Sequence, residues 1–301
     1  MINNSYLENI LEELSFPEEA RDAYRAVAAA LEIHPEQSRR MKETAELLFV
    51  IPQDTKLILS TLGEIADRLS IPAATVNFYL YITATEELRE LWRKMGLTEE
   101  TIHNCLRDFR YKNDECHMFT GVWGSYSDGW LMGWFKRDRF AFGRLQFDTR
   151  GLEVAEATVG GRTLHRGDKV VSVHIPRAPE PFSPEARLEA YRMAYSFFKD
   201  SFPDEQIPFI CGSWLLFPYN REILSPTSNT VSFADEFKLL AVYEADVWIR
   251  FIFGTLYTGN PDDLPESSSL HKGYKKFLKE GNMTGSGYGI FLFDGEKIVN
   301  E

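Results

Sequence analysis

The pattern of apolar and polar residues changes near the middle of the chain. Up to about residue 115, apolar residues recur every three or four positions, which is the period of amphipathic helices. Prolines stand near several of the expected helix starts, a position that suits them. The pattern predicts helices at Tyr6–Leu14, Pro17–Glu32, Ser38–Val50, Asp54–Leu69, Ala73–Met95 and Thr98–Lys112. The first part of the chain is therefore expected to be helical throughout.

From Phe140 the pattern becomes that of β-strands mixed with helices. Arg150-Gly151 separates two strand-like runs and indicates a hairpin. The expected strands are Phe142–Thr149, Leu152–Val159, Lys169–Ile175, Ile207–Pro218, Phe237–Glu244 and Ser286–Asp294. The expected helices are Pro184–Lys199, Tyr219–Leu224, Asp246–Gly254 and Ser267–Glu280. This order predicts a mixed sheet in the second part of the chain.

The stretch from Lys169 to Pro218 reads as a strand, a crossover helix and a second strand. Such a βαβ unit predicts a parallel strand pair, and its strands are apolar enough to be covered on both faces. Ligands of parallel sheets bind beyond the carboxyl ends of the strands, close to a helix N-terminus. We therefore expect a small-molecule site around His174–Phe182 and Ser213–Tyr219.

The chain has 301 residues, enough for two domains of roughly 150 residues each. We predict an all-helical N-terminal domain over residues 1–135. A mixed β-sheet domain with helices on both faces is predicted over residues 136–301, which makes the fold class α+β.

Net charge and composition argue against several classes of function. The formal net charge is −12, and neither half carries the positive excess expected of a nucleic-acid-binding protein. No apolar run is long enough to span a membrane, so no membrane association is expected. The first residues lack the basic and apolar regions of a signal peptide. The three cysteines make no disulfide framework, which is typical of a reducing compartment, and we predict a cytoplasmic location.

Three motifs in the first 135 residues suggest other functions. Leu62–Leu80 has the rhythm of a DNA-binding helix-turn-helix, but its second helix offers no Lys or Arg for phosphates. A zinc site is not expected, because His103, Cys105, Cys116 and His117 lack the close cysteine pair of structural zinc sites. The third motif is a glycine-rich segment with three tryptophans, which is either a packed junction or a slot for an apolar ligand. The tryptophans are Trp123, Trp130 and Trp134.

The order of elements after residue 140 resembles the GNAT superfamily of N-acyltransferases. Four phrases resemble a bacterial group that joins a helical N-terminal domain to a GNAT-like C-terminal domain. They are Phe142-Gly-Arg-Leu-Gln-Phe147, Val173-His-Ile-Pro176, Cys211-Gly-Ser-Trp-Leu-Leu-Phe-Pro218 and Ser228-Asn229. The resemblance implies acetyl-CoA or another acyl-CoA as donor, and an amine of a small molecule or peptide as acceptor. No metal is expected, and the oligomeric state cannot be read from the sequence.

The resemblance also implies where acyl-CoA binds. The pantetheine arm is expected to pair with the strand end at Val173, Ile175 and Arg177. The pyrophosphate is expected at the start of the following helix. The residues implied there are Phe182, Ser183, Glu185, Ala186 and Arg187, with Arg177 and Arg187 as charge partners. This loop has several prolines and no glycine, unlike the usual phosphate loop, so a non-catalytic binding protein that retains the fold is an alternative function.

His174 is the candidate general base, because histidine titrates near neutrality and this one ends the central strand. The alternative is a packed histidine, in which case water, Glu153 or Glu156 is the base. Tyr219 stands roughly where the superfamily places its acid tyrosine. Ser213 is grouped with these catalytic candidates, and Trp214 and Asn229 are predicted to contact substrate. Ser213 and Asn229 could instead satisfy local backbone groups.

Overall fold

A computed structural model describes residues 4–52 and 54–300. The chain divides into two compact units, Met1–Phe140 and Ala141–Glu301, whereas the boundary predicted from the sequence lies at residue 135. Each unit is considered by itself below.

The first unit is built from helices, as the apolar period predicts. Its described residues before Arg139 contain no β-strand. The helices are α1 (Asn4–Glu13), α2 (Glu18–Ile33), α3 (Pro35–Val50), α4 (Thr55–Leu69), α5 (Ala73–Lys94), α6 (Glu99–Thr120) and α7 (Asp128–Trp134). Thr98 caps α6 by accepting the Thr101 N–H, and Gly121 ends the helix with a positive φ of 73°. The helix therefore continues well beyond the predicted end at Lys112.

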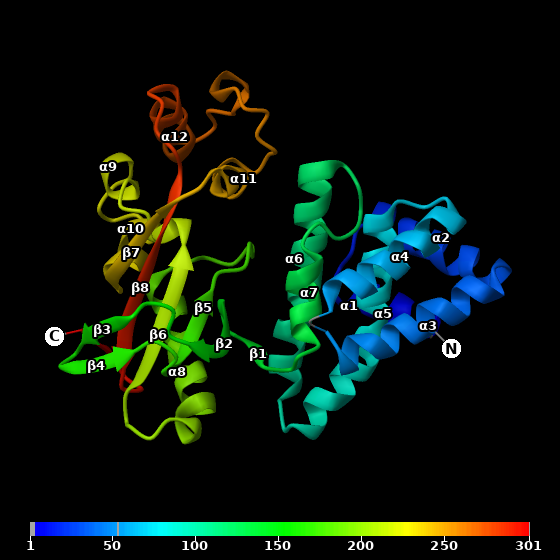
Figure 1. Cartoon of the computed structure of the whole chain (residues 1–301), viewed down its shortest axis with the longest axis horizontal. Coiled ribbons are helices and arrows are strands. Elements are labelled where there is room, and N and C mark those ends of the chain that lie inside the picture. The colour runs from blue at the N-terminus through cyan, green and yellow to red at the C-terminus, as the bar shows by residue number, and fades with distance from the viewer. Residues whose placement is uncertain (1–3, 53, 301) are drawn as a thin grey trace. The chain divides into compact units, whose positions relative to one another are not determined.

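The helix-turn-helix hypothesis fails because α5 is the central helix of this unit (Figure 1). Every residue of α5 from Thr75 to Thr85 is buried. The residues that would have to read DNA include Asn77 and Tyr79, whose side chains are 7% and 1% exposed. A recognition helix must present its N-terminal residues to the groove, so this pair of helices packs a core instead.

The part of the tryptophan-rich segment that contains Trp130 and Trp134 forms α7, a helix that was not predicted from the sequence. Trp130 and Trp134 lie four residues apart and both donate an indole N–H to Oδ2 of the buried Asp108, at 2.7 and 2.8 Å. The Arg139 guanidinium lies over the Trp130 ring, 3.7 Å from its centroid. The indoles are thus held by a buried carboxylate, which supports packing within the first unit.

The residues considered for zinc are occupied by other contacts. Trp123 stacks on His117 with 3.8 Å between the ring centroids, and Cys105 and Cys116 are buried. His103 pairs with Glu13 through Nδ1 at 3.1 Å. Among the described residues, no group of three or more histidine, cysteine or acidic side chains is arranged to hold a metal ion. Nor does the described chain contain a helix long and apolar enough to cross a membrane.

The second unit is a mixed sheet with the order β1-β2-β5-β6-β8-β7, and β9 pairs with β8 (Figure 1). Its strands are β1 (Arg139–Phe142), β2 (Leu145–Gly151), β5 (Lys169–His174), β6 (Ile207–Ser213), β7 (Lys238–Glu244), β8 (Gly285–Phe293) and β9 (Ile298–Val299). β5 and β6 are parallel, and α8 (Pro184–Phe198) connects them. The predicted βαβ unit and the α+β fold class are confirmed.

The predicted hairpin at Arg150-Gly151 is wrong. β2 runs through both residues and pairs with β5, with Arg150 opposite Val170. The turn lies earlier, at Gly143-Arg144, where Gly143 has a φ of 53° that favours glycine. The run Leu152–Val159 contributes only β3 (Glu156–Val159), which pairs with β4 (Arg162–His165) as a separate ribbon.

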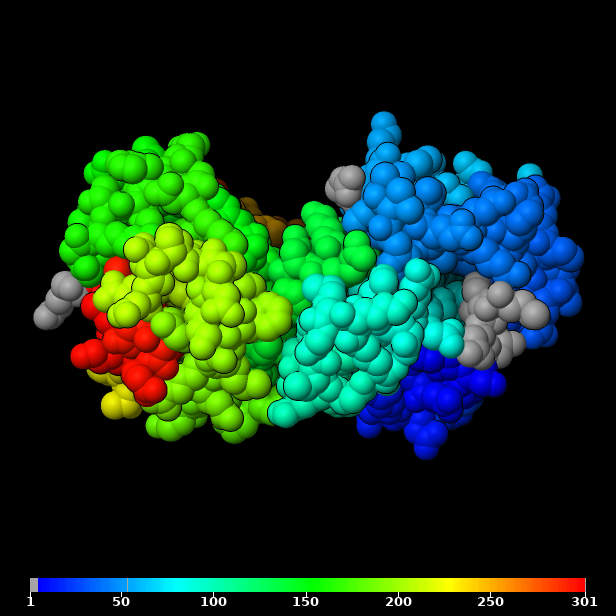
Figure 2. Space-filling view, turned by 90° about the horizontal axis from the view of Figure 1, so that it is seen from below, coloured from blue at the N-terminus to red at the C-terminus, as the bar shows by residue number. Residues whose placement is uncertain are grey.

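The two faces of the sheet are covered differently. On one face, α8 places Tyr191 against Phe209 and Phe291, at centroid distances of 5.9 and 5.0 Å. The other face carries Ile210 and Ile290, which pack with the β3–β4 ribbon. Figure 2 shows α8 (yellow-green) beside the C-terminal residues (red), where Arg192 pairs with Glu296.

Further helices gather near the end of the sheet toward which β6 points (Figure 1). They are α9 (Asn220–Ile223), α10 (Asn229–Asp235), α11 (Ile249–Phe253) and α12 (Ser269–Lys279). β6 ends at Ser213 because its hydroxyl accepts the Leu215 N–H and starts the 3₁₀ turn Trp214–Leu216. Gly285 and Gly287 of β8 make room for this turn, since a Cβ on either would meet Phe217 or Leu216 within 2.7 Å.

Candidate functional site

The parallel strands β5 and β6 separate toward their carboxyl ends. Their ladder contains Val171 opposite Phe209 and Ser172 opposite Ile210, and it ends there. β5 nevertheless continues to His174 and β6 to Ser213. The edges that face each other beyond Ser172 are therefore not joined by this ladder, and an extended ligand with amide groups can pair with them.

His174 lies at this opening, on the face of β5 that also carries Ser172. Its Nε2 lies 3.0 Å from Oδ2 of Asp148 on β2 and 3.4 Å from a guanidinium nitrogen of Arg150. Arg150 also donates to Asp148 Oδ1 at 2.8 Å. The Asp148 side chain is 8% exposed and that of His174 is 19% exposed, so the pair is only partly accessible to water.

This arrangement orients the imidazole. The contact to the carboxylate is shorter than the one to Arg150, so we assign the ring proton to Nε2, which donates to Asp148. Nδ1 then carries the lone pair that can accept a proton. Asp148 also stabilises the imidazolium that forms, while Arg150 neutralises part of the charge on the carboxylate. The chemistry available here is general-base catalysis.

Arg144, in the turn between β1 and β2, holds the loop between β5 and α8. Its guanidinium donates to the carbonyl oxygens of Pro176 at 2.9 Å, Glu180 at 3.0 Å and Ala178 at 3.5 Å. It also lies 5.4 Å from the ring centroid of Phe182. The loop is therefore shaped around an arginine, and not by glycines.

Arg187 holds the other end of the same loop from inside the core. Its side chain is fully buried and bonds to Glu236 at 2.6 Å, to Ser232 at 2.9 Å and to the Phe182 carbonyl at 2.9 Å. Burial raises the pKa of the Glu236 carboxyl above its ordinary value, although Arg187 acts in the opposite direction. The sequence-based assignment of Arg187 as a phosphate partner conflicts with this burial, because its donors face Glu236, Ser232 and the loop backbone.

The N-terminus of α8 has its own capping groups. Ser183 caps it by accepting the Ala186 N–H at 3.3 Å. The hydroxyl of Ser183 and the backbone N–H of Glu185 lower the pKa of the exposed Glu185 carboxyl. Val173 is buried, Ile175, Phe182 and Ala186 are half-buried, and Arg177 is exposed. Of the two arginines considered for phosphate, Arg177 is thus the one that reaches solvent.

The other candidates occupy a different neighbourhood. The Tyr219 hydroxyl donates to the Gly273 carbonyl at 3.4 Å, and its ring stacks on Phe277 of α12, so the residue packs with that helix. Trp214 packs against the same cluster. Ser213 caps the 3₁₀ turn, and Asn229 is exposed in the first turn of α10. The structure brings His174 together with Asp148 and Arg150, but shows no contact between His174 and Tyr219.

Sequence reasoning missed Asp148, Arg150 and Arg144. Alternation along β2 puts Gln146, Asp148 and Arg150 on one face, and that pattern was readable once the strand was extended through Gly151. The pairing of Asp148 with Ser172 and of Gln146 with His174 required the sheet order, which strand periodicity does not contain.

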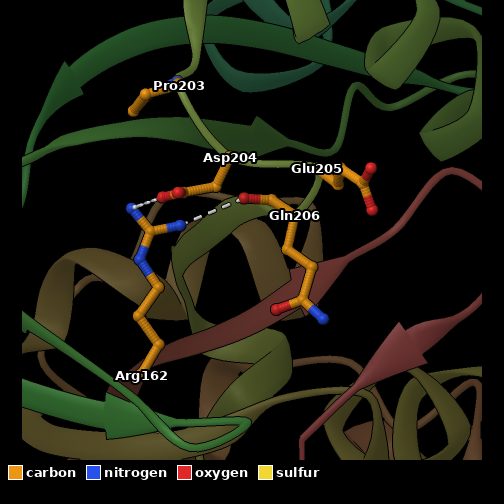
Figure 3. Close-up of a pocket in the computed structure, with 5 residues that line it drawn as sticks. All are labelled: Arg162, Pro203, Asp204, Glu205 and Gln206. Carbon is orange, nitrogen blue, oxygen red and sulfur yellow. Dashed lines mark hydrogen bonds and ion pairs between the residues drawn. The ribbon is translucent and has the colours of Figure 1, made fainter.

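A pocket of about 590 Å³ lies elsewhere in the second unit, lined by Arg162 and by the segment Pro203–Gln206 (Figure 3). Arg162 bridges it by pairing with Asp204 at 2.9 Å and bonding to the Gln206 carbonyl at 3.2 Å. This segment precedes the first residue of β6, so the pocket lies at the opposite end of the strand from Ser213. Parallel sheets bind ligands at their carboxyl ends, which favours the opening beside His174.

Comparisons with known proteins identify both parts of the chain. An N-acyltransferase N-terminal domain matches residues 5–136, and a GNAT-like C-terminal domain matches residues 140–291. No curated protein matches the chain in sequence. Three similar solved structures are acyltransferase complexes: with decanoyl-CoA and teicoplanin (22% identity), with CoA and 10C-teicoplanin (21%) and with decanoyl-CoA (20%).

Each of these structures has a TM-score of 0.73, and each alignment covers 94% of this chain and 86% of the other. At such low identity, the likeness establishes a shared fold. The two domain matches together span almost the whole chain. The protein therefore belongs to the acyltransferase family that joins an N-acyltransferase N-terminal domain to a GNAT-like C-terminal domain.

Proposed function

We propose that this protein is an acyl-CoA-dependent N-acyltransferase that moves an acyl group to an amine of a small molecule or peptide. The observation that carries the proposal is the opening between β5 and β6 with the Asp148–His174 pair at its edge. The opening offers strand edges that the β5–β6 ladder does not join, where the pantetheine arm can lie, and the histidine supplies a base beside it.

The reaction follows from this placement. The acceptor arrives as an ammonium ion and must lose a proton before its nitrogen can attack. His174 takes that proton at Nδ1, while Asp148 holds Nε2–H and stabilises the resulting positive charge. The amine nitrogen then bonds to the thioester carbonyl carbon, and the carbon–sulfur bond breaks. Its electron pair leaves with sulfur, which is protonated to give free CoA.

The donor's acyl chain is proposed to be longer than acetyl. The support comes from similar structures that contain decanoyl-CoA and octanoyl-CoA. Two of the solved acyltransferases also contain teicoplanin or its 10C form, which favours an acceptor larger than a simple amine. Acetyl-CoA, the donor predicted from the sequence, remains the reference donor for comparison.

A heat-stability measurement tests donor binding and chain length together. A ligand that binds only the native state adds RT ln(1 + [L]/Kd), about 2.7 kcal/mol at 100 Kd. Octanoyl- and decanoyl-CoA should each raise Tm by several degrees, and acetyl-CoA at the same concentration should raise it less. Equal shifts for all three donors would contradict the longer chain, and no shift for any would contradict acyl-CoA binding.

A non-catalytic binding protein is the second candidate. It is favoured by the four prolines of the loop and the burial of Arg187, which reduce the groups available to a pyrophosphate. Release of free CoA thiol from acyl-CoA in the presence of an amine distinguishes the two functions. Binding of acyl-CoA without thiol release in the presence of any amine would favour the non-catalytic function.

The Arg144 contacts lead to a separate prediction. Arg144→Met removes three donors to loop carbonyls, so the loop should lose the shape on which donor binding depends. KM for acyl-CoA should rise roughly tenfold, equivalent to about 1.4 kcal/mol, with a smaller change in kcat. Arg166→Met, at an exposed arginine after β4, is the matched control. If Arg144→Met and Arg166→Met have equal KM values for acyl-CoA, the Arg144 contacts do not affect donor binding and the prediction is wrong.

A further inference from the structure

Strand β7 forms one edge of the sheet, and among the described residues it pairs with β8 alone (Figure 1). All seven residues of β7 are exposed or half-buried, whereas β8 is buried along its whole length. Alternate N–H and C=O groups of an edge strand point away from the sheet, where another strand can pair with them. The outer side of β7 is therefore a template for a further strand.

Exposed apolar side chains gather around this edge. Of the large apolar residues described as exposed in the second unit, all but Phe197 lie between positions 239 and 283. Within β7, the exposed fractions are 43% for Leu239, 44% for Val242 and 56% for Tyr243. Val247, in the short turn after β7, is 48% exposed. Such a concentration of exposed apolar side chains is typical of an interaction surface.

β7 has few of the features that protect an edge strand from pairing. It contains no proline, and its charged residues, Lys238 and Glu244, stand at its two ends. A β-bulge between Leu239 and Ala241 bends the strand and turns both Leu240 and Ala241 toward the buried cluster of the β3–β4 ribbon. After the bulge, β7 pairs with β8 without a further shift as far as Glu244, so this part of the edge stays extended.

The sequence of β7 is complementary to itself when two copies run in opposite directions with Ala241 opposite Ala241. The facing pairs are Lys238 with Glu244, Leu239 with Tyr243, and Leu240 with Val242. A two-fold axis repeats each pair, so opposite charges meet at both ends of the strand and apolar residues meet between them. Opposite-charge pairs and apolar pairs are the cross-strand neighbours that stabilise antiparallel strands.

We propose that β7 is the surface through which two copies of this chain associate, by antiparallel β7–β7 pairing about a two-fold axis at Ala241. The two sheets then continue into each other. Lys238 keeps its bond to the Thr158 carbonyl at 2.6 Å, because an ammonium group has three donors. The opening between β5 and β6 is separated from β7 by β6 and β8, so the association is independent of the proposed reaction.

Sedimentation equilibrium of the full chain over a range of protein concentrations tests the proposal. The wild-type protein should be a dimer at high micromolar concentration and should dissociate on dilution. Val242→Lys puts a charge among the facing apolar side chains, and it should raise the dimer dissociation constant by at least about tenfold. Ile33→Lys is the matched control, since Ile33 is an apolar residue of the first unit that is 76% exposed. It should leave the dissociation constant unchanged.

Charge reversal tests the register. Lys238→Glu and Glu244→Lys each put like charges opposite one another at both ends of the pair, and each should weaken the dimer. The double variant restores opposite charges and should recover most of the wild-type association. Lys238→Glu also loses the contact with Thr158, but the double variant shares that loss, so its recovery reports the facing pair.

Three results would overturn the proposal. The first is a wild-type protein that stays monomeric at high micromolar concentration. The second is a dimer that Val242→Lys leaves intact, which would place the contact on another surface. The third is a double variant that associates no better than the single charge reversals. If Val242→Lys does not fold, the charge-reversal series decides, because Lys238 and Glu244 are exposed.

Discussion

Replacing His174 with glutamine should lower kcat by about 10²–10⁴, the usual effect of losing a general base. Glutamine retains a polar side chain that can bond to Asp148 but accepts no proton from the acceptor ammonium. In the wild-type protein the rate should rise with pH as His174 loses its proton, and the variant should lose this dependence. KM for acyl-CoA should change little, because the donor is proposed to contact backbone, and not the His174 side chain, at this strand.

His165→Gln is the matched control, since His165 is an exposed histidine on β4 that pairs with Glu156 at 3.7 Å. It should keep wild-type kcat. Asp148→Asn should give an intermediate loss, because the imidazole remains but its orientation and charge stabilisation are weakened. A folded His174→Gln protein with unchanged kcat would show that His174 is only packed. The base would then be water, Glu153 or Glu156.

Arg187→Met should destabilise the second unit by about 3–5 kcal/mol, the usual cost of leaving one partner of a buried ion pair alone. Arg187 is fully buried, and in the described part of the chain its loss leaves the Glu236 carboxylate bonded to the Tyr191 hydroxyl alone, at 2.7 Å. Arg192→Met on the same helix is the control. Its pair with Glu296 is exposed and should contribute about 0–1 kcal/mol. Denaturant unfolding measures both variants.

The loss of stability caused by Arg187→Met should be larger at higher pH. The folded-state pKa of Glu236 is already raised above its unfolded value, so the folded protein binds more protons than the unfolded chain in the window above that value. Stability from this group therefore falls as pH rises through the window. Removing Arg187 raises the Glu236 pKa further, so Arg187→Met should be more destabilising at pH 7 than at pH 5. Adding Glu236→Gln should recover most of the loss; an undiminished loss would contradict the charge argument.

Local patterns predicted much of the fold. Helical periodicity located α1 to α6, and the Ser183-Pro184-Glu185 signature located the start of α8. The apolar runs of β5 and β6 with the intervening helix predicted their parallel pairing. These features succeed because caps and side-chain periods act within a few residues. The elements that position His174 were therefore readable from the sequence.

Features that depend on distant residues were not readable. The two tryptophans of α7 donate both indole N–H groups to Asp108, a residue of α6 that the local pattern does not connect with them. Arg150-Gly151 has the composition of a turn, yet pairing with β5 keeps it extended. Arg187 stands in an exposed-looking helix start, and Glu236, 49 residues later, draws it into the core. In each case a partner far along the chain decided the outcome.

The glycine-free loop shows how a missing sequence signal can be replaced. Phosphate loops use glycine for sharp turns and close backbone approach. Here Arg144 binds the carbonyls of Pro176, Ala178 and Glu180, and Arg187 binds that of Phe182. Both guanidinium groups lie within 5.4 Å of the Phe182 ring centroid. The loop is thus ordered by buried or half-buried cations, and its proposed ligand contacts come from the strand end and Arg177.

A crystal structure of the protein with decanoyl-CoA tests the central claim most directly. The account predicts the pantetheine arm between β5 and β6, paired with backbone at Val173, and the thioester beside His174. It also predicts that the Pro176–Phe182 loop keeps its bonds to Arg144. If pantetheine is bound elsewhere, or if the opening between β5 and β6 is empty in crystals that contain the ligand, both the site and the proposed reaction are contradicted.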